Sequence, residues 1–424
     1  MSDALTFVMT GNEAAATAAR LARVQVIAAY PITPQSPVVE TLSRWVEDGE
    51  LSAEFVRVES EHSALSVCIA AASVGARVFT ATSANGLAYM NEQVWWAAGA
   101  RLPVVMCCAN RAMAAPWNVL NDQQDAMSVR DAGWIQLYCR DNQEILDTTL
   151  HAYRIASMLH LPVLVCYDGF LLSHTVMPVT VPMQARVDEF LPVSSALPVI
   201  DPCDPRNIGQ VTLAEPRPDA DGVLCHGYME LRALHQAALE SALQVIPQVD
   251  EAFAKIMGRI WGGLTWRHRL DDADVVLIAA GSLGMELTVV ADVLRGEDLR
   301  VGVLGIRSYR PFPVDAVRSA LSGRPLVVVF DKALSYGHEG PICSDVRAAL
   351  QPYQANASMD SDSAASQSPL GNMPVVFGAV AGLGGRDIEV EHLTAVVRRA
   401  QADLSAGVRR RPTEWVNLKL QATA

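Results

Sequence analysis

Tyr30-Pro31-Ile32-Thr33-Pro34 is the turn from which the predicted fold of this chain follows. It comes after an apolar run, residues 24–29, that is typical of a buried strand, and before residues 35–42, which are typical of a helix start. Two prolines fix the backbone of the turn and remove two amide donors. Because open parallel sheets bind ligands beyond the carboxyl ends of their strands, this turn is a candidate site. The alternative is an ordinary connection in which Thr33 caps the helix and Pro34 is its first residue.

The chain on either side of this turn repeats the same order of strand and helix. Further strands are predicted at residues 55–58, 77–83, 102–108 and 162–166, and helices at 12–23, 61–75, 90–98 and 143–158. The helix at 61–75 consists mostly of small residues, so we expect it to lie deep in the fold. This alternation predicts an α/β fold with a doubly wound parallel sheet.

The length of 424 residues is too great for one ordinary core, so more than one domain is expected. The first predicted domain is 1–260, and its last part, about 183–260, reads as an extended connecting arm with recurring prolines. The second predicted domain is 261–424, with strands at 274–281, 301–304, 325–330 and 375–377. A polar insertion at about 354–371 has the composition of a mobile surface loop.

The composition excludes some functions. A net charge of −13 argues against nucleic acid as a partner. Only 19% of the residues are charged, against a usual ~25%, so we expect extensive contacts with other subunits. Eight cysteines form no CxxC pair and no iron–sulfur or zinc pattern, which favours buried free thiols. No secretion signal and no apolar run of membrane-spanning length is visible, and a cytoplasmic location is expected.

Three polar side chains follow three predicted strands of the first domain. Thr33, Glu61 and Arg111 each stand just beyond a carboxyl end, and such ends face one crevice in a doubly wound sheet. Each also has a plain structural explanation. Thr33 could cap a helix, and Glu61 in the first turn of its helix gains about 0.3–1 kcal/mol without any function. Arg111 could pair with Asp122 or Asp125.

Other features give weaker signals. Residues 84–86 are predicted to form a turn. The loops Gly281–Gly284 and Gly382–Gly385 follow strands but lack the spacing of a dinucleotide or phosphate-binding loop. Trp95, Trp96 and Trp117 are expected in the core or at an interface.

Six motifs stand in order along the chain: Gly11-Asn12-Glu13-Ala14, Tyr30-Pro31-Ile32-Thr33-Pro34, Glu59-Ser60-Glu61-His62, Asn110-Arg111-Ala112, Asp131-Ala132-Gly133-Trp134 and Tyr309-Arg310-Pro311-Phe312-Pro313. Together they resemble the alpha subunit of the 2-oxoacid:acceptor oxidoreductases, the pyruvate:ferredoxin oxidoreductase group. The resemblance covers nearly the whole chain, and the phenylglyoxylate dehydrogenase branch is among the members it includes.

The resemblance implies a thiamine-diphosphate-dependent enzyme that converts a 2-oxoacid and coenzyme A to an acyl-CoA and carbon dioxide. It implies a pyrimidine-binding first domain and a second domain like the carboxyl-terminal domain of transketolase. Glu61 matches the glutamate that hydrogen-bonds the pyrimidine ring of thiamine diphosphate, and Pro31 lies in a cofactor-binding turn. Thr33 matches the threonine that hydrogen-bonds the substrate, and Arg111 the arginine that binds its carboxylate.

The resemblance also implies partner chains. This sequence has no Gly-Asp-Gly motif for diphosphate and magnesium, no cluster cysteines and no metal ligands of its own. Magnesium and the diphosphate site are therefore expected on a beta subunit, and iron–sulfur clusters on gamma and ferredoxin-like delta subunits. A flavin- or NAD-binding subunit is a further candidate, so electrons would leave to ferredoxin or NAD.

The substrate stays open at this point. Thr33 argues against the oxalate-specific branch, which resembles this chain elsewhere but has arginine there. Trp117, shortly after Arg111, could line a wider pocket, so pyruvate and an aryl 2-oxoacid such as phenylglyoxylate are equal candidates. Two alternatives to an active subunit are a non-catalytic scaffold of such a complex and a subunit of a transketolase-type transferase.

Overall fold

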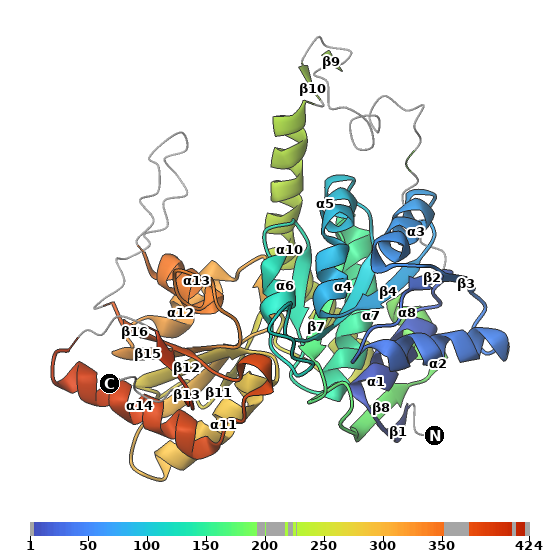
Figure 1. Ribbon diagram of the computed structural model, residues 1–424. Coiled ribbons are helices and arrows are strands. Elements are labelled where there is room, and N and C mark those ends of the chain that lie inside the picture. The colour runs from blue at the N-terminus through green and yellow to red at the C-terminus, as the bar shows by residue number, and fades with distance from the viewer. Residues whose placement is uncertain are drawn as a thin grey trace. The chain divides into compact units, whose positions relative to one another are not determined.

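The structure of the protein is a computed structural model that describes residues 4–192, 200, 217–218, 224–225, 227–351, 373–408 and 413–419. The chain divides into two compact units (Figure 1). Unit 1 comprises residues 1–264 with 307–311, and unit 2 comprises 265–306 with 312–424. The predicted insertion at 354–371 lies outside the described residues, as do residues 193–199 and 201–216 of the predicted connecting arm. The described part of that arm is mostly helical, at Gln184–Phe190 and Tyr228–Met257, so the prediction of an extended arm is wrong there.

Unit 1 is built on a twisted sheet whose strands are mostly parallel, which confirms the predicted α/β class. All neighbouring pairs are parallel except the one at the β14 edge, which is antiparallel. The strands of β4, β5 and β7 are buried along their whole length, as expected where helices cover both faces. Among the described residues the order is β14 (Ser308–Arg310), β6 (Ile135–Tyr138), β7 (Val163–Asp168), β5 (Val105–Asn110), β4 (Val78–Thr82), β2 (Val26–Ala29) and β3 (Glu54–Arg57).

Helices cover both faces of this sheet. One layer is α1 (Gly11–Leu21), α2 (Ser36–Glu47), α7 (Asn142–Leu159), α8 (Gln184–Phe190) and α10 (Tyr228–Met257). The other contains α3 (Glu61–Ser73), α4 (Ala84–Tyr89), α5 (Asn91–Gly99) and α6 (Gln124–Ser128), which contact one another. The alanines of α1 are fully buried, so this helix packs closely on its neighbours. Outside both layers, β1 (Ala4–Met9) pairs with β8 (Met177–Pro182), and β9 (Arg217–Pro218) with β10 (Leu224–Cys225).

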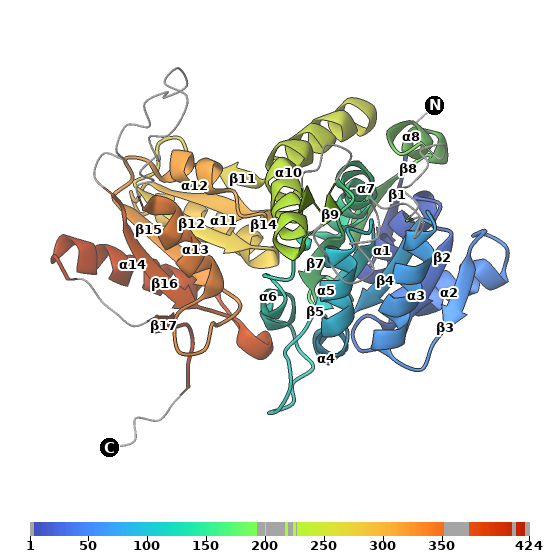
Figure 2. The ribbon, with the colours of Figure 1, turned by 90° about the horizontal axis from the view of Figure 1, so that it is seen from above.

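The long helix α10 packs along α7, and the two lie side by side in both views (Figures 1 and 2). It begins at Tyr228, ends at Met257 and contains Pro247. Although α10 is long, charged residues recur along it. No helix within the described ranges combines the length and the apolar character needed to cross a membrane.

One local prediction in unit 1 is wrong and another holds in part. Residues 84–86 form the first turn of helix α4 instead of an isolated turn. Helix α3 is deep in the fold on one face only, where Leu65 and Cys68 are fully buried, while Ala70 on its other side is exposed. A helix face of small residues that the described residues leave uncovered allows another backbone to approach closely.

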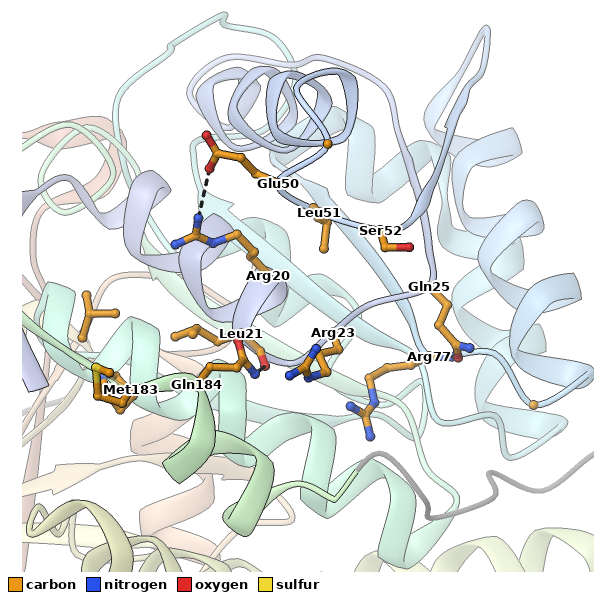
Figure 3. A pocket seen from close by; sticks show the side chains of 14 residues that line it. Arg20, Leu21, Arg23, Gln25, Glu50, Leu51, Ser52, Arg77, Met183 and Gln184 are labelled. Carbon is orange, nitrogen blue, oxygen red and sulfur yellow. Dashed lines mark hydrogen bonds and ion pairs between the residues drawn. The ribbon is translucent and has the colours of Figure 1, made fainter. Parts of the chain in front are cut away.

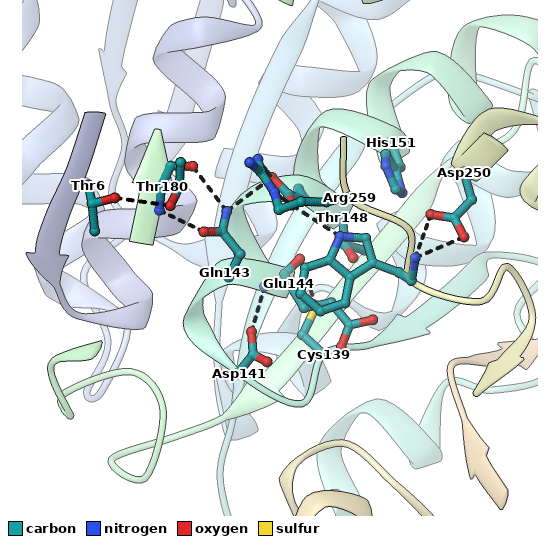
Figure 4. A network of polar contacts seen from close by, with 12 residues as sticks. Thr6, Cys139, Asp141, Gln143, Glu144, Thr148, His151, Thr180, Asp250 and Arg259 are labelled. Carbon is teal, nitrogen blue, oxygen red and sulfur yellow. Dashed lines mark hydrogen bonds and ion pairs between the residues drawn. The ribbon is translucent and has the colours of Figure 1, made fainter. Parts of the chain in front are cut away.

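A buried polar network ties α7 to two distant segments of unit 1. Arg307 and Glu144 are fully buried and form an ion pair with Nε to Oε1 at 2.9 Å. The same guanidinium donates to Thr148 and to the carbonyl of Gly263. Beside it, Gln143 exchanges hydrogen bonds with Thr180, and Asp250 accepts from the backbone at residues 261 and 263 (Figure 4). This network explains why residues 307–311 belong to unit 1 although unit 2 precedes and follows them in the chain.

Unit 2 is a second α/β layer structure around a mostly parallel sheet. Helices α11 (Ser282–Arg295) and α14 (Val390–Ser405) pack on one face, and α12 (Val314–Leu321) and α13 (Pro341–Leu350) on the other (Figure 1). A short helix, η1 (Leu383–Gly385), follows the strand β16. Among the described residues the strand order is β11 (Thr265–His268), β13 (Val301–Ile306), β12 (Val275–Ala280), β15 (Leu326–Asp331), β16 (Val375–Val380) and β17 (Glu414–Trp415), with β11 antiparallel.

The glycines of the loop after β12 have separate structural tasks. Gly281 has φ +64° and ψ −148°, a conformation that residues with a side chain avoid. A Cβ atom on Gly284 would lie 2.9 Å from the ring of Trp266. Close packing therefore accounts for Gly284 without any bound phosphate.

Candidate functional site

The turn at residues 30–34 joins β2 to α2 at the carboxyl edge of the unit 1 sheet. Helix α2 begins at Ser36 with Gln35 as its N-cap, and no side chain caps it. The amides of Gln35 and Ser36 donate to the Ile32 carbonyl at 2.7 and 3.1 Å. The alternative prediction, in which Thr33 caps the helix and its neighbouring proline opens it, is therefore wrong.

Thr33 and Arg111 meet directly across this edge. Arg111 follows β5, and its Nη1 donates to the backbone carbonyl oxygen of Thr33 at 2.7 Å. The Thr33 side chain is exposed, and within the described part of the chain neither its hydroxyl nor the Arg111 Nη2 has a hydrogen-bond partner. The geometry leaves a hydroxyl and part of a guanidinium side by side and available.

A buried carboxylate fixes the backbone around Arg111. Asp125 accepts from the backbone amides of Arg111 at 3.0 Å and Ala84 at 2.9 Å, and from the side chain of Asn110 at 2.8 Å. Burial raises the pKa of Asp125, against these donors, which lower it. The sequence alternatives paired the Arg111 side chain with Asp122 or Asp125. Asp125 does bind this residue, but through the main chain, so no carboxylate occupies the guanidinium, which donates to the Thr33 carbonyl and keeps Nη2 for another partner.

Glu61 opens helix α3 at the same edge of the sheet. Its neighbour Ser60 is the N-cap and accepts from the amide of Ser63 at 3.2 Å, as the sequence predicts. The position is favourable for a negative charge because the helix N-terminus carries partial positive charge. Glu61 is only 8% exposed, yet no donor in the described ranges hydrogen-bonds its carboxylate. Both carboxylate oxygens are therefore available to a donor from a ligand.

Helix α4 lies very close to the Glu61 side chain. A Cβ atom built on Gly86 would lie 2.8 Å from Oε1 of Glu61 and 2.5 Å from Oγ1 of Thr82. Glycine is unfavourable inside a helix, so this position is explained by the space that the carboxylate needs. Helix α4 is held at its start by Asp125, through the amide of Ala84.

The predicted convergence is thus met in part. Thr33 and Arg111 are in contact, whereas Glu61 lies at the same edge without a direct contact to either. The two sides are connected through Asn85, whose Oδ1 accepts from the amide of Ala114 at 3.0 Å in the loop after Arg111. The site is therefore an open row along the strand ends rather than one closed cluster.

The remaining predicted residues lie on the surface of this edge. Pro31 is exposed. Trp117 is 74% exposed, and Trp95 and Trp96 are each 45% exposed, so none of the three belongs to the core of this chain. Whether they form an interface stays a prediction. His62 turns away from Glu61 towards α5, with Nε2 3.1 Å from the side-chain nitrogen of Gln93.

Sequence reasoning missed two residues that shape the site. The sequence suggests Asp125 only as an ion-pair partner for the Arg111 side chain. No pattern in the sequence marks a carboxylate that accepts hydrogen bonds from backbone amides. Gly86 was assigned to a turn, although its place between a strand end and the residues that follow is where close approach needs glycine. Among the described residues no group of three or more His, Cys, Asp or Glu side chains could hold a metal ion.

Comparison with known proteins identifies the two halves of the chain separately. Residues 17–240 match the family model described as pyruvate flavodoxin/ferredoxin oxidoreductase, thiamine diphosphate binding. Residues 273–393 match the model for core domain II of pyruvate:ferredoxin oxidoreductase.

Curated relatives match over almost the whole chain. Pyruvate synthase subunit PorA of Methanothermobacter thermautotrophicus is 40% identical and that of Methanocaldococcus jannaschii 43%, each over 97% of this chain and 98% of the relative. Ketoisovalerate oxidoreductase subunit VorA of Pyrococcus horikoshii is 39% identical over the same shares.

A solved structure shares the fold. It is the 2-oxoglutarate:ferredoxin oxidoreductase from Magnetococcus marinus, with 2-oxoglutarate, coenzyme A and succinyl-CoA bound, at a TM-score of 0.64 and 18% identity. The match covers 94% of this chain but only 65% of that longer chain. At this identity the likeness supports the fold alone.

Proposed function

Because this chain belongs to the alpha subunits of the 2-oxoacid:ferredoxin oxidoreductases, we propose that it supplies the pyrimidine and substrate side of a thiamine diphosphate site shared with a partner chain. The observation that carries the proposal is the buried Glu61 carboxylate without a donor. It stands at the edge where Arg111 and Thr33 keep free donors. Along one row, the Glu61 carboxylate can accept a hydrogen bond from a cofactor, and the Thr33 hydroxyl and the Arg111 guanidinium can bind an anionic substrate.

The residues present fit the pyrimidine part of thiamine diphosphate. Glu61, whose carboxylate has no donor among the described residues, would hold a protonated ring nitrogen by a hydrogen bond. An enclosed carboxyl group at a helix start is also suited to accept and return a proton. Pro31 in the exposed turn is a further contact. When bound, thiamine diphosphate supplies a carbon nucleophile that attacks the keto group and takes up the electrons left when carbon dioxide departs.

Arg111 and Thr33 would bind the 2-oxoacid. The guanidinium is held on one side by the Thr33 carbonyl, so its remaining donors are presented in a fixed direction. Such a fork of donors matches a carboxylate. The Thr33 hydroxyl lies beside it and would hydrogen-bond the keto or carboxylate oxygen of the same substrate.

Partner chains would complete the reaction. The exposed side chains Tyr89, Trp95, Trp96 and Trp117 on or next to α4 and α5 have the character of interface residues, because aromatic side chains are enriched there. Helix α3 contacts α4 and α5 and has a small-residue face that the described residues leave uncovered. We propose that a beta subunit covers this surface and brings magnesium and the diphosphate site, and that gamma and delta subunits carry iron–sulfur clusters to ferredoxin or, through a flavin subunit, to NAD.

The substrate is a 2-oxoacid, with pyruvate and phenylglyoxylate as the proposed candidates. The relatives named for pyruvate and for ketoisovalerate are similarly distant, so identity does not separate these substrates. Trp117 is mostly exposed in this chain and would reach a substrate only once the partner is in place. A cytoplasmic location is proposed with this assignment, and the six described free, buried cysteines agree with a reducing compartment.

The experiment is an assay of the co-expressed complex with coenzyme A and each of pyruvate, ketoisovalerate and phenylglyoxylate. We expect Glu61→Ala to lose most activity with every substrate and to weaken thiamine diphosphate binding. Arg111→Ala and Thr33→Ala should raise the substrate KM while cofactor affinity, measured by titration calorimetry, stays near wild type.

Glu40→Ala is the matched control for Glu61→Ala, because Glu40 is an exposed carboxylate on the neighbouring helix α2. Wild-type turnover of the Glu61→Ala complex would contradict the catalytic role and favour a non-catalytic scaffold. Unchanged kcat and KM in Arg111→Ala would remove the carboxylate clamp. Trp117→Ala should alter the preference between aryl and alkyl substrates if this residue lines the pocket.

A further inference from the structure

Unit 1 has a polar concavity at the edge of its sheet opposite to Thr33, Glu61 and Arg111. It has a volume of about 790 Å³. Gln25, Ser52 and Arg77 line it shortly before β2, β3 and β4, at the amino ends of the strands, whereas Thr33, Glu61 and Arg111 follow carboxyl ends. We call it the amino-edge cleft; its lining includes Arg20, Arg23, Gln25, Ser52, Arg77 and Met183.

Arg77 is the most unusual member of this lining. Its side chain is almost fully buried, at 8% exposure, and burial lowers the pKa of its guanidinium. One of its five N–H donors binds the carbonyl of Ala22 at the end of α1. Within the described residues no carboxylate lies within ion-pair distance of it. Capping the helix explains one donor. Asp188 acts on the Arg77 charge at longer range but is itself bound by Arg23, so no carboxylate pairs directly with Arg77 within the described residues.

Two more guanidinium groups border the cleft, and their present partners are on the surface. Arg20 pairs with Glu50 at 3.2 Å, and Arg23 pairs with Asp188 through two contacts of 2.8 Å. All four of these side chains are partly or largely exposed to solvent. Exposed ion pairs are weak and readily exchanged, so both arginines can turn to a ligand that brings stronger negative charge.

The cleft has one polar end and one apolar end. Figure 3 shows Met183 at one end and Arg77 with Gln25 at the other. Val181 and Pro182 continue the apolar wall next to Met183. At the polar end the amide of Arg77 donates to Oε1 of Gln25 at 2.9 Å, which leaves the amide group of Gln25 without a partner among the described residues. A cleft of this volume, with one polar and one apolar end, suits a ligand that has an anionic end and a flat, less polar end.

We propose that the amino-edge cleft binds a phosphorylated ligand of nucleotide size, with its phosphate oxygens on Arg77 and Gln25 and its base against Met183. Arg20 and Arg23 bind the outer phosphates when more than one is present. This site is separate from the proposed reaction site, and its occupation does not depend on the proposed reaction.

The test is titration calorimetry of the purified full chain with ATP, coenzyme A and inorganic phosphate. ATP and coenzyme A represent two sources of the same chemistry, a free nucleotide and a nucleotide-bearing thiol. We expect at least one to bind with a dissociation constant of about 100 µM or tighter. Inorganic phosphate, which has no base, should bind at least about tenfold more weakly. No binding of either nucleotide at about 1 mM, or equal affinity for phosphate, overturns the proposal.

Two variants locate the site. Arg77→Met should weaken nucleotide binding by more than about tenfold, because it removes the buried charge. Gln25→Glu keeps the acceptor for the Arg77 amide but replaces the donor by a negative charge, on an exposed residue that the fold tolerates. It should weaken binding by about the same factor.

Arg44→Met is the matched control, because Arg44 is an exposed arginine of α2 outside the cleft. It should leave the affinity unchanged. Wild-type affinity in Gln25→Glu would place the nucleotide elsewhere and overturn the assignment, whether or not Arg77→Met folds.

Discussion

Replacing Gly86 by alanine tests whether the space beside Glu61 matters for the proposed reaction. The added Cβ atom would lie 2.8 Å from Oε1 and 3.0 Å from Cγ of Glu61. It would also lie 2.5 Å from Oγ1 of Thr82, which is fully buried. Contacts below 3.0 Å are not tolerated, so one neighbour must move, and the Glu61 side chain has more freedom than a threonine on a central strand.

Two effects on stability oppose each other in this variant. Alanine in a helix is favoured over glycine by about 0.8–1 kcal/mol. Overpacking a well-filled site costs about 1–3 kcal/mol. The net loss in the free energy of unfolding should therefore be about 0–2 kcal/mol, which leaves the protein folded. A displacement of a reacting group by ~1 Å costs about 100-fold in rate. Activity should fall far more than stability.

The assay is kcat of the reconstituted complex together with thermal denaturation of the chain. Gly99→Ala in the neighbouring helix α5 is the control, because its Cβ would meet only the end of the flexible Arg232 side chain at 3.4 Å. This control should keep full activity and gain slight stability. A Gly86→Ala complex with wild-type kcat would refute the reasoning, since Glu61 would then tolerate displacement or not take part.

Three further outcomes follow from the buried charges. Arg307→Met removes the 2.9 Å ion pair of the fully buried Glu144 and leaves it only the Arg140 guanidinium, 3.5 Å away. The free energy of unfolding in urea denaturation should fall by up to about 3–5 kcal/mol, and an effect below about 1 kcal/mol would show that the pair contributes little. Burial raises the pKa of Asp331 to about 7, so the folded state keeps a proton that the unfolded state releases. The unfolding free energy should therefore fall as pH rises from about 4 to 7, by at most about 1.4 kcal/mol per pKa unit, and melting curves of Asp331→Asn should lack this slope. Asp125→Asn places an amide where backbone N–H groups of Ala84 and Arg111 need an acceptor, and it should raise the substrate KM of the complex while thiamine diphosphate affinity changes less; an unchanged KM would limit Asp125 to folding.

The strand and helix order of unit 1 could be predicted because each element follows from the pattern of neighbouring residues in the sequence. Buried parallel strands are continuous apolar runs, and Ser60 before Glu61 is a recognisable helix start. The edge strand β14 could not be predicted in this way. It pairs with β6 from more than 160 residues away, and its attachment depends on the Arg307–Glu144 pair, which no local pattern reveals.

The site shows the same division between local and distant information. That Thr33 and Arg111 share an edge follows from the topology of parallel strands. Which atoms meet does not, because the backbone carbonyl of Thr33, not its hydroxyl, accepts from Arg111. The role of Gly86 likewise depends on a side chain from another helix, so a sequence pattern can mark the glycine but not its reason.

The three carbonyl groups of the turn after β2 explain why two prolines suit it. The Ile32 carbonyl accepts from the first amides of α2, and the Thr33 carbonyl accepts from Arg111. The Pro34 carbonyl accepts from Asn12 at 2.8 Å, and Asn12 is held in turn by Tyr167. Prolines remove amide donors and keep every carbonyl, so the turn is attached to its surroundings through acceptors alone. The Thr33 hydroxyl takes no part in that attachment, so it is free to bind a ligand.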